Sequence, residues 1–193
     1  MKFLKKTADS LIISEKLSYN GSAKDKKRLK ELLLIEQKGF CAYSERFIKN
    51  IDSVHIEHFD GGLKNTDEDG YYNYNAVLAF MNLTKPKKIE PFKPILMPFD
   101  DDFNERIGFD ENEYFVVAKD DIEAENLINY LGFNKYELAI DRESHIKRLR
   151  NVLEMVDNDI DEFVKFISKD KSNLSFPTAI ENEFNIVLDS YLN

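Results

Sequence analysis

The stretch SVHIEHFDGG, residues 53–62, decides the fold, because it holds two of the three histidines in the chain and ends in two glycines. Val54 and Ile56 alternate with polar residues, which is the pattern of a strand with one apolar face. The strand runs into Glu57 and His58, and then into the loop DGGLKNTDEDG, which is rich in turn-forming residues. Such a segment is either a candidate site for metal-assisted chemistry or a polar strand end that meets a turn.

A helix is expected on each side of this strand. Residues 24–38 follow a helical apolar period, with Ser22 as a candidate N-cap and Gly39 as a candidate C-cap. After the loop, the apolar stretch YYNYNAVLAFMNLTK has no helix breaker before Pro86. We therefore predict a second helix from about Tyr74 to Lys85, and a strand, loop and helix in that order.

The rest of the chain is mostly helical in pattern. Prolines at four positions between residues 86 and 98 predict an extended or looped segment. The stretch NERIGFDENEYFVVAK predicts a two-strand hairpin with its turn at Asp110–Glu113. Further helices are expected over residues 121–131, 134–157, 158–169 and 178–191. The predicted fold class is α+β, mostly helical, with a domain over residues 1–145 and a helical appendage over residues 146–193.

Composition restricts the function classes. The chain has 193 residues, one cysteine and a formal net charge of −9. A single cysteine excludes an intramolecular disulfide and indicates a cytoplasmic setting. No apolar run reaches the roughly 18 to 20 residues that span a bilayer, and the first residues lack the pattern of a signal peptide. The acidity argues against a stand-alone nucleic-acid binder, so any contact with DNA requires a local basic patch or a basic partner.

The residues around the strand end match the needs of a single-metal nuclease. Glu57 and the side-chain carbonyl of Asn82 are hard oxygen ligands for a divalent cation. His58 can take a proton from an attacking water, because the pKa of an imidazole lies near neutrality. Asn73 can hold the loop or the histidine ring in place. Asn75 competes for this last role.

At these residues the sequence resembles the HNH endonucleases, which have the ββα-metal fold. That family has an acidic residue and His on the first strand, then an Asn, and nine positions later a His or Asn on the helix, followed by Lys after two residues. The matching residues are Glu57-His58, Asn73, Asn82 and Lys85. The resemblance implies His58 as general base with Asn73 in support, Glu57 and Asn82 as metal ligands, and Mg²⁺ or Mn²⁺ as the metal.

Three further segments extend the resemblance over roughly residues 30–145. The segments LLIEQKGFCAYSERF, ILMPFDDDFNERIGF and LINYLGFNKYELAIDR are similar to those of HNH subunits in Septu-type and retron-associated anti-phage systems. This resemblance implies an ATPase partner with an SMC-like or ABC-type head. Residues from about 146 onward match no segment of that subfamily and are a candidate docking surface for the partner.

One departure concerns the structural zinc that many HNH proteins bind with two Cys-x-x-Cys pairs. Here the first pair would be Cys41 and Ser44, and the second would be Leu78 and Met81. We therefore predict no structural zinc, with Leu78 and Met81 packed as apolar residues. The loss of ligands also keeps a second hypothesis open, namely a catalytically inactive HNH-like scaffold that binds a partner or nucleic acid.

Other polar residues have weaker interpretations. Lys85, Lys87 and Lys88 follow the second helix and are candidates for phosphate contacts, or they belong to a solvated loop. His55 has no position in the family pattern, and His145 is expected on a solvated helix face. Basic stretches over residues 24–30 and 142–150 can face nucleic acid or an acidic partner. The first hypothesis is thus a metal-dependent HNH endonuclease that cuts DNA; an RNA-directed nuclease is a lesser alternative.

Overall fold

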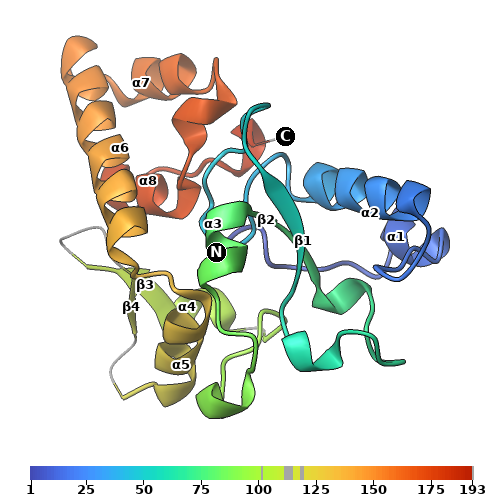
Figure 1. The fold of residues 1–193 in the computed structure, drawn as a ribbon. Coiled ribbons are helices and arrows are strands. Elements are labelled where there is room, and N and C mark those ends of the chain that lie inside the picture. The colour runs from blue at the N-terminus through green and yellow to red at the C-terminus, as the bar shows by residue number, and fades with distance from the viewer. Residues whose placement is uncertain (101, 111–114, 118–119, 193) are drawn as a thin grey trace.

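The computed structural model describes residues 1–100, 102–110, 115–117 and 120–192, and shows an α+β fold (Figure 1). Its centre is an antiparallel pair of strands, β1 (Val54–His58) and β2 (Tyr74–Leu78), followed directly by helix α3 (Ala79–Thr84). Figure 1 shows helix α2 (Ala23–Glu36) and helix α6 (Tyr136–Met155) on opposite sides of this strand–strand–helix unit. The unit is therefore enclosed by helices from both halves of the chain.

Strand β2 corrects the prediction of one helix from about Tyr74 to Lys85. The first five residues of that stretch pair with β1, from Val54 opposite Leu78 to His58 opposite Tyr74, and only the remainder forms α3. All five β2 residues are buried. A short apolar run that is buried on both faces has no periodicity that separates strand from helix. Pairing with β1, which the local sequence does not show, decides between them.

Helix α2 confirms the helix predicted over residues 24–38. The Ser22 side chain accepts a hydrogen bond from the Asp25 backbone N–H, and the Asp25 side chain accepts one from the Ser22 N–H, which forms a capping box. Leu29 and Leu33 on this helix pack with Ala76 of β2 in one apolar cluster. Helix α1 (Leu11–Ser14) joins the same cluster through its buried residue Ile12.

The second edge of β2 is covered by the turn that follows α2. The backbone N–H of Ala42 donates to the Ala76 carbonyl over 3.1 Å, and Gln37 pairs with both backbone groups of Ala76. Phe40 and Phe47 close the turn through an isolated bridge. Residues 39–47 thus form an ordered turn that completes the sheet edge.

The hairpin predicted after the proline segment is confirmed by strands β3 (Ile107–Phe109) and β4 (Phe115–Val117), which are antiparallel. Residues 111–113 of its predicted turn lie outside the described residues. The proline segment has one short 3₁₀ turn, Glu90–Phe92, and a single helical turn, α4 (Phe103–Arg106), precedes β3. A looped segment with little helix is what the prolines predicted.

The last part of the chain is helical, as predicted. Its remaining helices are α5 (Ile122–Leu131), α7 (Ile160–Ile167) and α8 (Pro177–Phe184). Gly132, at φ 70°, ends α5 in the left-handed conformation that glycine favours. Helix α8 stops earlier than residue 191, because Asn185 also takes a left-handed conformation and a 3₁₀ turn, Asp189–Tyr191, follows. Further 3₁₀ turns span Gly61–Leu63, Tyr71–Asn73 and Lys171–Leu174.

Glu45 joins the turn after α2 to the C-terminal helices. Its side chain, 1% exposed, accepts hydrogen bonds from the Lys2 N–H and from the Thr178 N–H and hydroxyl. Its carbonyl accepts another from the Phe176 N–H. Glu45 holds a left-handed backbone at φ 59°, which is strained for a residue with a side chain. These bonds, made to the buried carboxylate and carbonyl, stabilise that conformation.

One apolar cluster includes buried residues from Met1 through Leu192. The residues on either side of position 145 therefore share a core. The division into residues 1–145 and 146–193 stays a prediction. Within the described residues, none of the helices combines the length and the apolar character that crossing a bilayer needs.

His145 corrects the expectation of a solvated position. Its side chain is buried on α6, with Nε2 2.9 Å from the Asn173 carbonyl and Nδ1 3.0 Å from an Arg148 nitrogen. Nε2 therefore donates and Nδ1 accepts, which requires a neutral ring. Burial lowers the pKa of His145. The helix predicted over residues 134–157 is confirmed by α6. The sequence does not show, however, that Phe176 packs against the His145 ring.

The lowered pKa makes the stability depend on pH. Below about pH 6.5 the unfolded chain binds a proton at His145 that the folded protein binds only at lower pH, so the free energy of unfolding falls as pH falls. In His145→Gln, which keeps a donor toward Asn173, we expect lower stability at neutral pH but a flatter decline toward acid. Thermal unfolding at a series of pH values checks this; parallel curves for both proteins would contradict it.

Candidate active site

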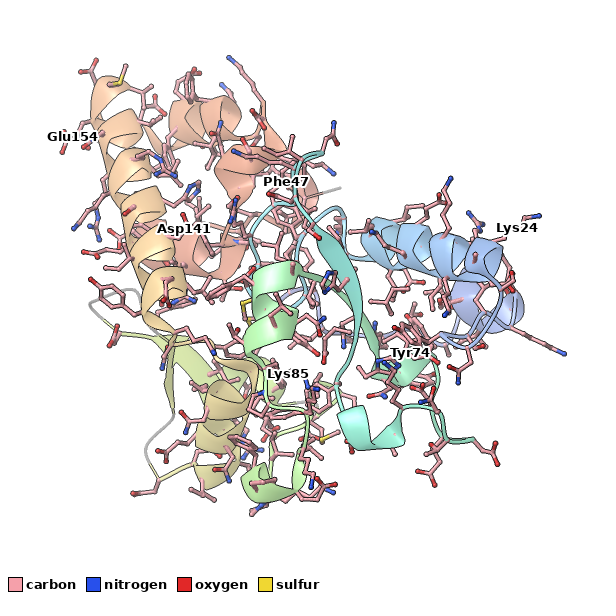
Figure 2. The ribbon with its side chains drawn as sticks, in the orientation of Figure 1. Lys24, Phe47, Tyr74, Lys85, Asp141 and Glu154 are labelled. Carbon is pink, nitrogen blue, oxygen red and sulfur yellow. The ribbon has the colours of Figure 1, made fainter. Side chains whose placement is uncertain are left out.

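The two central residues of the sequence motif, Glu57 and His58, point to opposite sides of β1. Glu57 contacts Tyr43 and Lys85, whereas His58 contacts Asp69. Figure 2 shows Lys85 and Tyr74, which lie near the two side chains, on either side of β1 in that view. Glu57 and His58 point to opposite sides because adjacent side chains alternate along a strand. The two groups therefore have different surroundings.

His58 lies in a cage of aromatic and carboxylate groups. Its Nε2 is 3.2 Å from an Asp69 carboxylate oxygen, and its ring packs edge-on against Tyr19 and Tyr74. Burial lowers the pKa of His58, and the Asp69 charge opposes part of that shift. A neutral ring with its proton on Nε2, facing Asp69, keeps the lone pair on Nδ1. That atom is the candidate proton acceptor.

Asn73 supports this arrangement through Asp69, as the sequence predicted for the supporting asparagine. Its amide nitrogen donates to Asp69 over 3.1 Å and to the Asp60 carbonyl over 3.0 Å, and its oxygen accepts from the Asp60 N–H over 2.7 Å. Both ends of the loop are thus tied to one side chain. Asn75 instead points inward toward Tyr43. The structure therefore places Asn73, and not Asn75, against the Asp69 carboxylate that contacts His58.

Asp69 is a site residue that the sequence reasoning missed. Its side chain is 1% exposed although it lies in a loop rich in Asp, Glu and Asn. The loop also contains Asp67 and Glu68, which are exposed. The only local signal is that Asp69 precedes Asn73 by four residues, and this spacing does not by itself single it out.

Glu57 is held in a buried ion pair. Its carboxylate, on a residue 5% exposed, lies 3.0 Å from the Lys85 ammonium and accepts a hydrogen bond from the Tyr43 hydroxyl. Burial raises the pKa of Glu57, while Lys85 and Tyr43 lower it. The charge of Glu57 is therefore balanced within the protein.

Lys85 is turned inward, which conflicts with its expected role as a surface phosphate contact. Its side chain is 2% exposed, and its ammonium also donates to the Tyr130 hydroxyl over 2.8 Å and to the Phe59 carbonyl over 3.2 Å. Lys87 and Lys88 are exposed, as expected for phosphate contacts or for a solvated loop. The three lysines are close in sequence, but only Lys85, at the end of α3, points into the core.

Asn82 on α3 faces β1 and pairs with His55. The distance between Asn82 Nδ2 and His55 Nδ1 is 2.7 Å, so the amide donates and its oxygen is left for another partner. His55 and Glu57 lie on the face of β1 opposite to that of His58. His55 contacts Asn82 on α3, and Glu57 contacts Lys85 at the end of α3. His55 therefore positions Asn82, a role for which the sequence pattern gave no indication.

One pocket of about 480 Å³ brings most of the predicted site residues together. Its walls include Glu57, His58, Asn82 and Lys85, with Lys64 and Lys87 also lining it. Asn73, which donates a hydrogen bond to Asp69, does not line this pocket. The pocket is thus bordered by a carboxylate, an imidazole, an amide and lysines, which is a suitable surrounding for an anionic substrate.

The donor set is compatible with a hydrated divalent cation. Within the described part of the chain, no three His, Cys, Asp or Glu side chains group together as a metal cage. Mg²⁺, however, is commonly held by one or two protein oxygens, with water and substrate phosphate completing its shell. Glu57 and Asn82 would supply those oxygens, and Glu57 would exchange its contact with Lys85 for the ion.

The residues at the positions of the zinc ligands pack as predicted. Leu78 and Met81 are 8% and 1% exposed and belong to the same apolar cluster as Cys41. The Leu78 N–H donates to the Cys41 sulfur over 3.4 Å. The apolar packing is confirmed; the absence of a structural zinc stays a prediction.

No family model, no curated protein and no solved structure matches this chain. The chemistry of the site therefore rests on its own residues.

Proposed function

We propose that this protein is a divalent-metal-dependent endonuclease of the HNH type that hydrolyses phosphodiester bonds in DNA. The observation that carries the proposal is the buried His58, fixed by Asp69 and Asn73, at the wall of a pocket shared with Glu57 and Asn82. A neutral, oriented imidazole beside oxygen donors and lysines supports metal-assisted hydrolysis of a phosphate ester.

The residues have distinct tasks in this mechanism. Nδ1 of His58 takes the proton of the attacking water, and Asp69 holds the ring and stabilises the imidazolium that results. Lys64 and Lys87, which line the pocket, attract the phosphate. A divalent ion held by Glu57 and Asn82 would supply charge stabilisation at the phosphate oxygens. His55 accepts a hydrogen bond from the Asn82 amide nitrogen, so the Asn82 oxygen would be available to such an ion.

The biological role belongs to the same proposal. The protein would be the cytoplasmic effector subunit of a bacterial anti-phage system and would act with an ATPase that has an SMC-like or ABC-type head. Sequence resemblance supports this, and the net charge of −9 agrees with a subunit whose partner contributes basic surface. Residues 146–193 are the proposed docking region. A gene for such an ATPase beside this one would support the role; its absence across genomes would count against it.

A second function is favoured by one observation, the Glu57–Lys85 ion pair. A carboxylate already neutralised by a lysine at 3.0 Å is a poor metal ligand until that pair opens. The protein would then be an inactive HNH-like scaffold that binds nucleic acid or a partner.

Plasmid cleavage separates the two functions. We expect the purified chain to nick supercoiled plasmid with Mg²⁺ or Mn²⁺, and chelator to abolish the nicking. An RNA substrate in parallel tests the choice of sugar. If neither nucleic acid is cut, with or without a co-expressed ATPase, and calorimetry detects no Mn²⁺ binding that Glu57→Gln removes, the scaffold is favoured.

Asp69 provides a test of the orientation of His58. In Asp69→Asn we expect the cleavage rate to fall by about 10²-fold, because a misplaced base loses that order of catalysis. Asp67→Asn changes the same charge in the same loop at an exposed position, and should cleave at the wild-type rate. Single-turnover rates of both variants check this. Equal rates would show that the Asp69 contact does not serve catalysis.

A further inference from the structure

The pocket at His58 continues along β1 into a second pocket. This neighbour, of about 670 Å³, shares Tyr19, Ile56 and Asn82 with the first. Its other walls include residues of α2, among them Lys26 and Lys30. The two pockets together form a groove that runs from α2 past β1 to the end of α3, and we call it the lysine groove.

The lysine groove is positive on a negative protein. Lysines 26, 27, 30, 64, 85 and 87 line it. Within the described residues, the ion pairs of the structure do not include Lys26, Lys64 or Lys87. The acidic residues in its walls are Glu57, paired with Lys85, and Glu31, which lies 4.0 Å from Lys27. With a formal net charge of −9, this local positive strip contrasts with the rest of the molecule and suits a polyanion.

Tyr19 lies where the two pockets meet. The ammonium groups of Lys26 and Lys64 lie over its ring, 5.0 Å and 4.7 Å from the centroid, and the edge of His58 packs against it. A ring occupied by two ammonium groups is not a free platform for stacking a base. The groove therefore offers charge to phosphates and presents no stacking surface at Tyr19.

Lys30 adds a fixed cation on the far side. Its ammonium donates to the Val54 carbonyl over 2.9 Å, at the start of β1. Lys30 and Lys64 thus mark the two ends of a path along the strand, with His58 near the second. A phosphate chain that follows this path passes the candidate base.

We propose that the lysine groove binds the sugar–phosphate backbone of nucleic acid, independently of base sequence, and guides one phosphate to His58. The proposal deepens the nuclease function and rests on it for the identity of the target phosphate. The residues that carry binding are Lys26, Lys64 and Lys87, with Lys30 at the far end. Phosphate contacts fix position on a nucleic acid and carry no sequence information.

Binding measured without metal tests the groove apart from catalysis. The probe is a fluorescein-labelled 20-base-pair DNA duplex at low salt in EDTA, read by anisotropy. The triple variant Lys26→Gln/Lys64→Gln/Lys87→Gln should bind at least tenfold more weakly, and its salt dependence, log K against log[salt], should be shallower by about 2 to 3 units. The matched control is Lys147→Gln/Lys165→Gln/Lys169→Gln, three lysines outside the lysine groove, which should bind as wild type.

Each outcome of the binding measurement either supports or overturns the proposal. The proposal is supported if only the groove variant loses affinity for the duplex and if the wild-type protein binds duplexes of unrelated sequence equally well. No binding by the wild-type protein, equal loss in both triple variants, or strong preference for one sequence overturns it. A protein that binds through the groove but never cuts would keep this inference and remove the nuclease. If the protein cuts nucleic acid and the groove variant binds as wild type, the nuclease proposal is kept and the groove proposal is overturned.

Discussion

In His58→Ala, we expect metal-dependent nicking of plasmid to slow by about 10²- to 10⁴-fold, the usual contribution of a general base. His58 is the only side chain of the pocket whose proton-accepting atom is kept neutral by burial and oriented by a carboxylate. Water without this acceptor attacks slowly. Binding of the 20-base-pair duplex in EDTA should be unaffected, because the lysines carry it. Single-turnover cleavage and anisotropy measure the two effects.

A more conservative variant separates chemistry from structure. His58→Gln can still donate to Asp69 but accepts protons poorly, so it should fold as wild type and cleave as slowly as His58→Ala. Added imidazole should restore part of the rate in His58→Ala, where the ring has left a space. Wild-type activity in either variant would place the base elsewhere or identify a contaminating nuclease.

In Lys85→Met, we expect the free energy of unfolding to fall by about 3–5 kcal/mol, because the change leaves the Glu57 carboxylate buried without its cation. Only the Tyr43 hydroxyl among its two side-chain partners would remain. Domains of this kind are stable by about 5–15 kcal/mol, so this is a large share. Urea unfolding at neutral pH measures it. The loss should be smaller at acid pH, where Glu57, its pKa raised further, binds a proton in the folded state.

The double variant Glu57→Gln/Lys85→Met removes both charges and should recover much of that stability. Lys88→Met, at an exposed neighbour, is the matched control and should change stability by less than about 0.5 kcal/mol. A loss in Lys85→Met no greater than in Lys88→Met would show that water reaches the pair. Glu57 would then be free to bind a metal without opening a buried ion pair.

The sequence predicted those parts of the fold that local patterns determine. Helix α2 has its capping box and apolar period within its own residues, and β1 has its alternation. Strand β2 was predicted as a helix because its pairing partner, β1, lies about twenty residues away and apolar content alone does not select it. Pairing across a loop is a tertiary effect that overrides local propensity.

The residues of the candidate site also divide into those that the sequence predicted and those that only the fold reveals. His58, Asn73 and Asn82 were selected by residue type and by resemblance to the HNH pattern; the structure places His58 on β1, Asn73 in the turn before β2 and Asn82 on α3. Asp69 and the inward direction of Lys85 could not be predicted, because a loop carboxylate or a lysine reveals its partner only when the fold brings distant residues together. The contact of His55 could not be predicted for the same reason, because its partner Asn82 lies on α3.

The hydrogen bonds of Glu45 have a consequence for synthesis on the ribosome. The chain emerges from its N-terminus, and domains fold as their residues appear. Glu45 sits in the turn that completes the β2 edge, yet its partners Phe176 and Thr178 are translated only after the whole of α6 and α7. Until then its strained backbone and carboxylate lack those bonds. Completion of the sheet edge is thereby linked to translation of α8, so products truncated before α8 would carry a poorly formed strand–strand–helix unit.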